Sequence, residues 1–487
     1  MIETEEKADK AEKSDDLNVL ENNSKNDSLS ENIYKLNGKV PLATALTIGL
    51  QHVLAMFVSN VTPIIIITGI ATLNGEVISS AIKTQLIQNA MFIAGIATLI
   101  QLFGIGPIGA RLPIVMGISF TFLSVATARP GIDYNIIMGS IIVGGLAEGF
   151  LGLFYKHWKR LISPIVTSCV VIGIGISLLP VGAVSFCGGN VNAADFGSLK
   201  NWLVGSITLI SCLVSLNLFK STLKALSPLF ALIIGFLVAI PLGLIDLSSL
   251  ASSGYIDFPV IFPTGKPIFE LGNIISFLFI FLVSATETIG DTSAICYGAL
   301  NREMTEKEGS GSLACDGFSS TFAAVFGCSS TTSFSQNVGL INLTKVVNRF
   351  VVATGAIILV FASFFPALAA LLMAVPQPVL GGCTILMFGQ IFISGIQMLY
   401  KNGLNERNLT IASVSLCLSV GLSSNPKMFL FMPELIQKIF ATNPVSIIFV
   451  VALILDLLLP KDTEQKTTHD LKDENLENSE LIQNKQN

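Results

Sequence analysis

The feature that most constrains this chain is its apolar body, which runs from Val40 to Pro460. Those 421 residues hold 16 acidic and 18 basic side chains, whereas segments 1–39 and 461–487 together hold 17 and 10. Of the whole chain, 51% is hydrophobic, and the mean hydropathy is +0.71. This composition is too apolar for a water-soluble globular protein of this length. The sequence therefore predicts a protein embedded in a lipid bilayer.

Segments 1–39 and 461–487 are polar tails. They are rich in Glu, Asp, Lys, Asn and Ser, so they cannot bury enough apolar surface to offset chain entropy, and we expect them to be disordered. The formal net charge of −5 then reflects solvated tails and indicates no nucleic-acid partner. No basic start followed by an apolar run precedes Val40, so the first spanning helix is expected to direct insertion.

The apolar body divides at its polar and glycine-rich breaks into 14 segments. A helix needs roughly 20 apolar residues to cross the hydrocarbon, and only the third and tenth segments look short. We expect an all-α polytopic membrane protein, with a first seven-span repeat over 40–246 and a second over 247–460. The predicted spans are 43–70, 84–104, 112–127, 136–155, 163–183, 202–219, 228–246, 271–298, 311–327, 336–348, 350–375, 379–399, 408–424 and 443–460.

The distribution of basic residues predicts the orientation in the membrane. With both tails in the cytoplasm, the inner loops of the body carry 12 Lys and Arg side chains and the outer segments carry 6. This bias is typical of a correctly oriented bundle with an even number of spans. The strongest single marker is the basic loop 156–160, in which a tryptophan lies among cations. We expect a multi-pass protein of the cell membrane with both termini in the cytoplasm.

Two glycine- and serine-rich interruptions occupy matching places in the two halves. The first, at 104–109, precedes a short segment at 117–122 with alternating character, and the second, at 327–339, follows about 215 residues later. Non-helical backbone at membrane depth is tolerated only where it is buried in protein or lines a cavity. The pattern predicts an inverted-repeat transporter with strand-like breaks in segments 3 and 10. The first break spells GxGxxG, but it lacks the soluble strand–helix context of a dinucleotide loop.

Charged side chains inside the spans are candidates for function because charge in the hydrocarbon is costly. Glu287 and Asp291 are four residues apart, which places both on one face of the eighth helix, and Asp316 lies in the next segment. These acids could accept hydrogen bonds from substrate N–H groups or bind a travelling proton. The alternative is that they join helices through Ser and Thr. Glu148 and Asp456 could equally be end-of-helix groups that reach water.

Metal binding and enzyme catalysis have little support in the sequence. His52 is the only histidine within a span, and a lone histidine there more often makes a structural hydrogen bond than carries protons. The eight cysteines include no CxxC pair and mostly lie in apolar runs, as small buried residues do. We therefore expect no metal, no cofactor other than a coupling proton, and no enzymatic activity.

The second break offers groups that suit a flat, polar heterocycle. The Gln336 amide presents one acceptor and one donor, which match the adjacent C=O and N–H of an oxopurine. Phe334 could stack on such a ring. Backbone N–H groups at Ser335 and Phe120 could complete the contacts at the broken ends. The alternative is a Ser/Thr-rich break that merely satisfies its own backbone.

Several ordered motifs resemble those of the nucleobase/ascorbate transporters, especially the xanthine and uric acid permeases. They are Gln51-His52, Ser119-Phe120, Glu287-Thr-Ile-Gly-Asp291, Asp316-Gly317, and a stretch from Gln336-Asn337 to Thr344-Lys345 that fits Q/E-N-x-G-x4-T-R/K. The resemblance covers the whole body. Gln336 resembles the purine branch, because uracil permeases have Glu there, and Asp291 stands where uracil permeases carry His.

The resemblance implies 14 helices in two inverted repeats, with a core domain from helices 1–4 and 8–11 and a gate domain from the others. It implies a homodimer that imports xanthine or uric acid with a proton by an elevator-like movement of the core. A uracil permease, or an anion exchanger or uniporter of this architecture, is the alternative. The implied substrate-binding residues are Glu287, Gln336, Phe120, Ser335 and Phe334, and those supporting the site and proton coupling are Asp291, Asp316, His52 and Asn337.

Overall fold

The computed structural model describes residues 31–158, 163–219, 221–246, 250, 254–441 and 444–460, and it is mostly helical. The predicted tail 461–487, residues 1–30 of the other tail, and Lys159 and Arg160 of the basic loop lie outside this range. The α-helices are α2 (Leu42–Ile70), α3 (Ser80–Phe103), α4 (Leu123–Ala128), α5 (Tyr134–Leu153), α6 (Tyr155–Trp158), α7 (Pro164–Phe186), α8 (Leu199–Leu218), α9 (Ser227–Ala239), α11 (Leu271–Gly298), α12 (Glu306–Val325), α13 (Ser335–Thr344), α14 (Arg349–Ala362), α15 (Pro366–Met373), α16 (Gln377–Lys401), α17 (Glu406–Ser423), α18 (Glu434–Phe440) and α19 (Pro444–Leu458).

Within the described ranges, seven helices are long and apolar enough to cross a membrane: α2, α3, α5, α7, α8, α11 and α16. The predicted span 350–375 is not one straight helix, because α14 and α15 meet at an angle of 86° next to Pro366. Proline has no N–H to donate, which favours the start of a new helix at this point. Helix α18 lies outside every predicted span.

The third predicted segment, 112–127, contains a strand, and a second strand lies in the predicted break 327–339, just before the tenth predicted segment at 336–348. Strand β3 (Met116–Ile118) precedes α4, and β4 (Thr331–Ser333) precedes α13. The strands pair antiparallel with each other, with Gly117 opposite Thr332. A second pair, β1 (Thr72–Leu73) and β2 (Glu76–Val77), forms a hairpin after α2. The two breaks, one from each half of the chain, therefore form a single two-stranded sheet.

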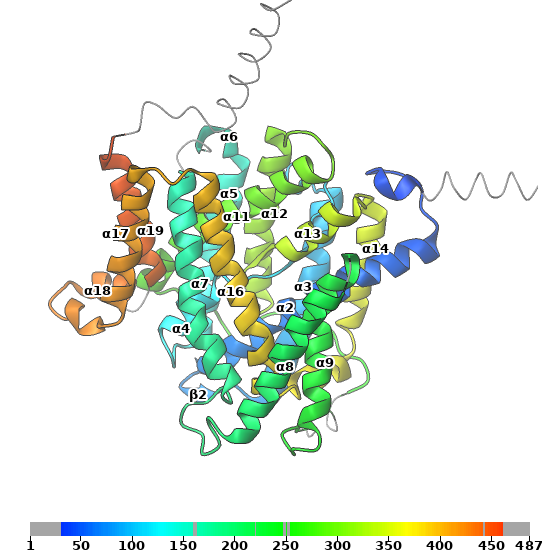
Figure 1. Ribbon diagram of the computed structural model, residues 1–487, viewed down its shortest axis with the longest axis horizontal. Coiled ribbons are helices and arrows are strands. Elements are labelled where there is room, and N and C mark those ends of the chain that lie inside the picture. The colour runs from blue at the N-terminus through cyan, green and yellow to red at the C-terminus, as the bar shows by residue number, and fades with distance from the viewer. Residues whose placement is uncertain are drawn as a thin grey trace, which may run out of the picture.

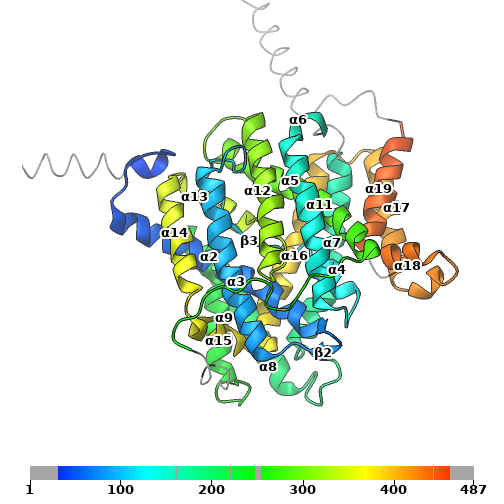
Figure 2. The same ribbon diagram turned by 180° about the vertical axis from the view of Figure 1, so that it is seen from behind.

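The helices pack into two groups. In the first bundle, α5 packs on α12 and α11, and α14 packs on α2 and α3; in the second bundle, α16 packs on α7 and α8, α8 on α9, and α19 on α7 and α17. Figures 1 and 2 show α17 and α19 at one end of the molecule and α14 at the other. Strands β3 and β4 contact α2, α3, α11 and α12, so they belong to the first bundle.

The last residues of the predicted N-terminal tail contact the start of α14. Residues 31–39 are described, with a short 3-10 helix, η1 (Glu31–Tyr34), at their start. The side-chain amide of Asn348 donates to the carbonyl oxygens of Asn32, Lys35 and Gly38 at 3.0, 3.0 and 2.8 Å. Asn348 also caps α14, because its side chain accepts from the N–H groups of Phe350 and Val351. One buried amide thus fixes this segment to the start of α14.

Glycines bring α5 and α12 into backbone contact. A Cβ atom added at Gly317 would lie 2.1 Å from the amide nitrogen of Gly149 and 2.6 Å from the carbonyl oxygen of Gly145. Real Cβ atoms do not approach backbone so closely, so only glycine fits at this crossing. Small residues serve this purpose between membrane helices in general.

We predict that Gly317→Ala destabilises the protein by roughly 1–3 kcal/mol, because the added methyl group would force the two helices apart. Thermal unfolding of the purified full chain in detergent measures this. Gly421→Ala in α17 is the matched control, since nothing lies within 4 Å of a Cβ there. Helix propensity should leave that variant unchanged or slightly more stable. Equal melting temperatures for the two variants would contradict the packing argument.

Candidate functional site

The centre of the candidate site is the β3–β4 pair, which is buried along its whole length. Two further backbone hydrogen bonds extend it, from Phe334 N to Val115 O at 2.9 Å and from Ser119 N to Ser330 O at 2.8 Å. Backbone polar groups at membrane depth must find partners within the protein. The two broken segments satisfy part of each other's backbone, and because they run antiparallel, the chain leaves toward α4 at one end of the pair and toward α13 at the other.

Side chains of α2 and α3 hold β3 in place. The carbonyl oxygen of the Asn60 side chain accepts from Ile118 N at 2.8 Å, and its amide group donates to Ala90 O at 3.3 Å. The Thr98 hydroxyl accepts from Met116 N at 2.9 Å. Neither residue was among the predicted site residues. In the sequence, the one indication of their role is that each is an uncharged polar residue inside an apolar span.

Glu287 and Asp291 lie on α11 and face the broken segments. The Thr121 hydroxyl, from the segment after β3, donates to Glu287 Oε2 at 3.2 Å. Asp291 accepts from the hydroxyls of Ser333 at 2.7 Å and Ser335 at 2.9 and 3.1 Å. One turn of α11 therefore contacts the breaks from both halves of the chain, and Asp291 fixes the first residue of α13.

Asp316 is fully buried on α12, next to α11. It accepts hydrogen bonds from the hydroxyls of Thr288 and Ser284, the latter at 3.4 Å. Its second carboxyl oxygen, Oδ1, has no hydrogen-bond partner among the described residues. Thr288 also lies 3.3 Å from the hydroxyl of Thr332 in β4. Asp316 is thereby linked to the paired strands through a single hydroxyl.

His52 and Asn337 connect α2 to α13. The amide nitrogen of Asn337 donates to the backbone oxygen of His52 at 3.0 Å and lies 3.2 Å from its Nδ1. Both side chains are buried, with 2% of His52 and none of Asn337 exposed. These contacts hold the half-helix α13 against the first spanning helix.

The two predicted aromatic residues lie in different surroundings. Phe334 is only 4% exposed, and its ring lies over Gly117, where an added Cβ would meet ring carbon Cε2 at 2.1 Å. The ring of Phe120 meets Phe388 of α16 edge-on, with centroids 5.5 Å apart. Phe120 therefore touches the second bundle, while Phe334 packs within the first.

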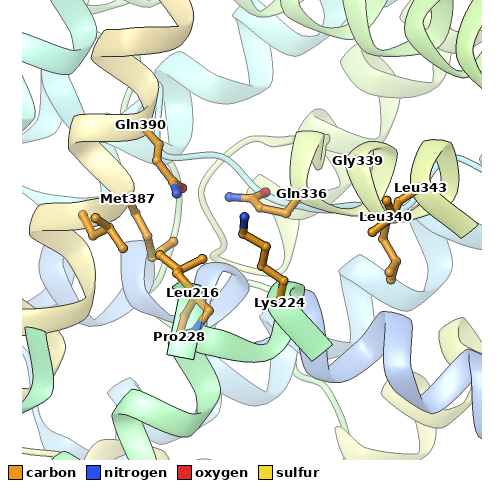
Figure 3. A pocket seen from close by; sticks show the side chains of 10 residues that line it. Leu216, Lys224, Pro228, Gln336, Gly339, Leu340, Leu343, Met387 and Gln390 are labelled. Carbon is orange, nitrogen blue, oxygen red and sulfur yellow. The ribbon is translucent and has the colours of Figure 1, made fainter. Parts of the chain in front are cut away.

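A cavity of about 240 Å³ lies between the two bundles. Gln336 is the one predicted site residue that lines it, and Glu287 and Asp291 do not. The side chains of Gln336, Gln390 and Lys224 converge on this space from α13, from α16 and from the short helix η2 (Ser221–Leu226) (Figure 3). The other lining residues are Leu216, Pro228, Gly339, Leu340, Leu343, Leu386 and Met387.

Two acids outside the predicted site have different surroundings. Glu148 does not reach water at a helix end, because it is 1% exposed, and neither of its carboxyl oxygens has a hydrogen-bond partner among the described residues. Asp456 pairs with Arg407 at 2.7 Å. The described residues contain no group of three His, Cys, Asp or Glu side chains arranged to hold a metal ion.

Comparisons with known proteins agree on one kind of protein. A family model described as "Permease family" matches residues 43–428. A provisionally named purine permease of Clostridium perfringens is 33% identical over 91% of this chain and 96% of its own length. The nucleobase transporter PlUacP of Paenibacillus larvae is 33% identical over 85% and 94%. The xanthine permease XanQ of Escherichia coli is 30% identical over 90% and 96%.

Two solved membrane-protein structures have a similar fold. The transmembrane domain of the cyanobacterial bicarbonate transporter BicA has a TM-score of 0.52 and 14% identity, covering 85% of this chain and 97% of that domain. The structure of SLC26A9 has a TM-score of 0.60 and 10% identity, covering 86% and 65%. At these identities, the likeness concerns the fold alone.

We predict that Asn60→Leu lowers the free energy of unfolding by roughly 1–3 kcal/mol, because it leaves the buried N–H of Ile118 without an acceptor. Chemical or thermal unfolding in detergent reports the loss. Asn217→Leu, at an exposed position of α8, serves as control and should change stability little. Similar losses in both variants would mean that the Asn60 contact does not hold β3.

Proposed function

The chain belongs to the nucleobase/ascorbate transporter family, a family of permeases, and we propose that it imports an oxidised purine, xanthine or uric acid, together with a proton. The observation that carries the proposal is the Gln336 amide at the wall of the cavity between the bundles. Names of similar proteins, including a nucleobase transporter and a xanthine permease, support the substrate class.

Gln336 binds the edge of the base through one donor and one acceptor. Glu287 accepts from a ring N–H of the base; it is half-buried and lies one turn from Asp291, which contacts the residue preceding Gln336. The backbone N–H groups of Phe120 and Ser335 complete the edge contacts. Phe334 is the least accessible of the proposed binding residues, so its stacking requires the ring to leave its place over Gly117.

Proton coupling uses the buried acids. Asp291 lies one turn from Glu287 on α11, Asp316 contacts α11 through Thr288, and hydroxyl groups join the two acids to β4 and α13. Burial without a cation favours the neutral acid, so a proton entering with the substrate offsets the cost of closing the site. His52 and Asn337 position α13 for this step.

The movement we propose is an elevator-like shift of the first bundle, the core, past the second, the gate, in a homodimer with 14 spans. Two features support inverted repeats. Helix α3 packs on α14 as α12 packs on α5, and α8 packs on α9 as α17 packs on α19. The cavity draws residues from both bundles, so such a shift would change its access. Both termini would lie in the cytoplasm.

Two alternatives of the same architecture remain distinguishable. A uracil permease is disfavoured by two residues of this chain. By the resemblance described above, uracil permeases carry Glu at the position of Gln336 and His at the position of Asp291. An anion exchanger or uniporter is suggested by the fold of BicA and SLC26A9. Half-helix ends alone can bind an anion, so Glu287 beside them favours a ligand with N–H donors.

We predict that cells lacking other purine uptake, when they produce this protein, accumulate labelled xanthine or urate. A protonophore should abolish the accumulation because the proton gradient drives it. The measurement compares uptake with and without the protonophore, and with and without a sodium gradient. Accumulation that follows sodium would refute proton coupling, and accumulation of uracil alone would refute the purine assignment.

We predict that Glu287→Gln abolishes binding and uptake together, through loss of roughly 1.5–3 kcal/mol for each charge-assisted hydrogen bond. Uptake and substrate-dependent thermal stabilisation of the purified protein measure the two effects. Glu303→Gln, in the loop between α11 and α12, is the control and should transport normally. Normal uptake by a well-expressed Glu287→Gln variant would show that the acid does not grip the base.

We predict that Gln336→Glu weakens xanthine binding and admits uracil-like bases, because the side chain loses its donor and gains a charge. Competition of unlabelled bases against labelled xanthine measures this change. Gln390→Glu, on the opposite wall, tests whether any acid in the cavity has the same effect. Unaltered purine affinity in Gln336→Glu would refute the pairing of the amide with the base.

A further inference from the structure

The wall of the cavity that faces Gln336 carries a positive charge. Lys224 is the one charged side chain among the residues that line the cavity, and in Figure 3 its ammonium group points across the space toward the Gln336 amide. The Gln390 amide approaches from α16. The cavity therefore presents two amides and a cation to whatever enters it.

The backbone holds Lys224 at this position. The hydroxyl of Ser227 donates to the carbonyl oxygen of Lys224 at 2.8 Å, and Leu226 between them is buried. Helix η2 packs against α13 and α2 of the first bundle as well as α8 and α9 of the second. The backbone of Lys224 is thus held where the two bundles meet. Its side chain is exposed, and its ammonium group has no hydrogen-bond or ion-pair partner among the described residues.

Closing the bundles around a substrate removes water from this ammonium group. An ammonium group that loses water without gaining a partner is costly, so a neutral base would leave the cost uncompensated. A base that has lost a ring proton spreads its negative charge over ring nitrogens and carbonyl oxygens, which accept strong hydrogen bonds from a cation.

We propose that Lys224 is a specificity-determining residue that pairs with the charge of an anionic oxopurine, so that the urate monoanion binds better than neutral xanthine. The inference rests on the proposed function of the same cavity. Uric acid is a monoanion at neutral pH and xanthine is mostly neutral, and the two differ by the C8 carbonyl alone. They are therefore a matched pair of probes.

The test measures KM for labelled urate and labelled xanthine at neutral pH in cells that lack their own purine uptake. It uses the full chain, the variants Lys224→Met and Lys224→Arg, and Lys307→Met as control. Lys307 is an exposed lysine in the first turn of α12 and does not line the cavity. Immunoblots of the membrane fraction normalise for the amount of each variant.

Wild type is expected to have the lower KM for urate. Lys224→Met should raise the urate KM roughly 10- to 100-fold, the size of a lost charge-assisted contact, and the xanthine KM less than about 3-fold. Lys224→Arg should retain most of the urate preference because it keeps the charge, and Lys307→Met should match wild type. A loss shared equally by both substrates, or by neither, would overturn the inference.

Failure of this inference can be told from failure of the proposed function. If wild type imports xanthine but prefers it to urate, the proposed function stands and the role of Lys224 is wrong. If wild type imports neither purine, the proposed function fails and this inference fails with it.

Discussion

The structure depends on the hydrogen bonding between two interrupted segments that are more than 200 residues apart. Strands β3 and β4 pair with each other at buried positions, where a backbone group without a partner would cost several kcal/mol. Each break satisfies part of the other's backbone, and Asn60 and Thr98 satisfy two further N–H groups of β3. The starts of α4 and α13, the Thr121 contact to Glu287 and the serine contacts to Asp291 all depend on this pairing.

Much of the fold could be predicted from local chemistry. Long apolar runs predicted the helices well, as 43–70 and 271–298 show beside Leu42–Ile70 and Leu271–Gly298. Clustered Gly, Ser and Thr predicted the interruptions, and the alternating character of residues 117–122 predicted a strand-like segment there. The bend between α14 and α15 was missed because the apolar pattern continues through Pro366, and hydropathy does not report direction.

The site could be predicted less completely, because its geometry comes from contacts between distant segments. Glu287, Asp291 and Asp316 stood out as acids in apolar spans, and Gln336 stood out next to a break. Lys224 looked like an ordinary inner-loop cation, and Gln390 like any polar residue in a long helix. Glu148 looked like a helix-end group, yet the α5–α12 crossing buries it. Whether a residue lines the cavity depends on the tertiary packing of helices, which the local sequence does not report.

The glycine crossing of α5 and α12 bears on how the protein can change shape. Gly145 and Gly149 meet Gly317 backbone to backbone, which leaves no side chains that could repack as one helix slides along the other. The contact between the glycines therefore favours one relative position of α5 and α12. The shift proposed above would therefore carry α5 and α12 together, and the larger side chains at the contact of Phe120 with Phe388 would be the ones that repack.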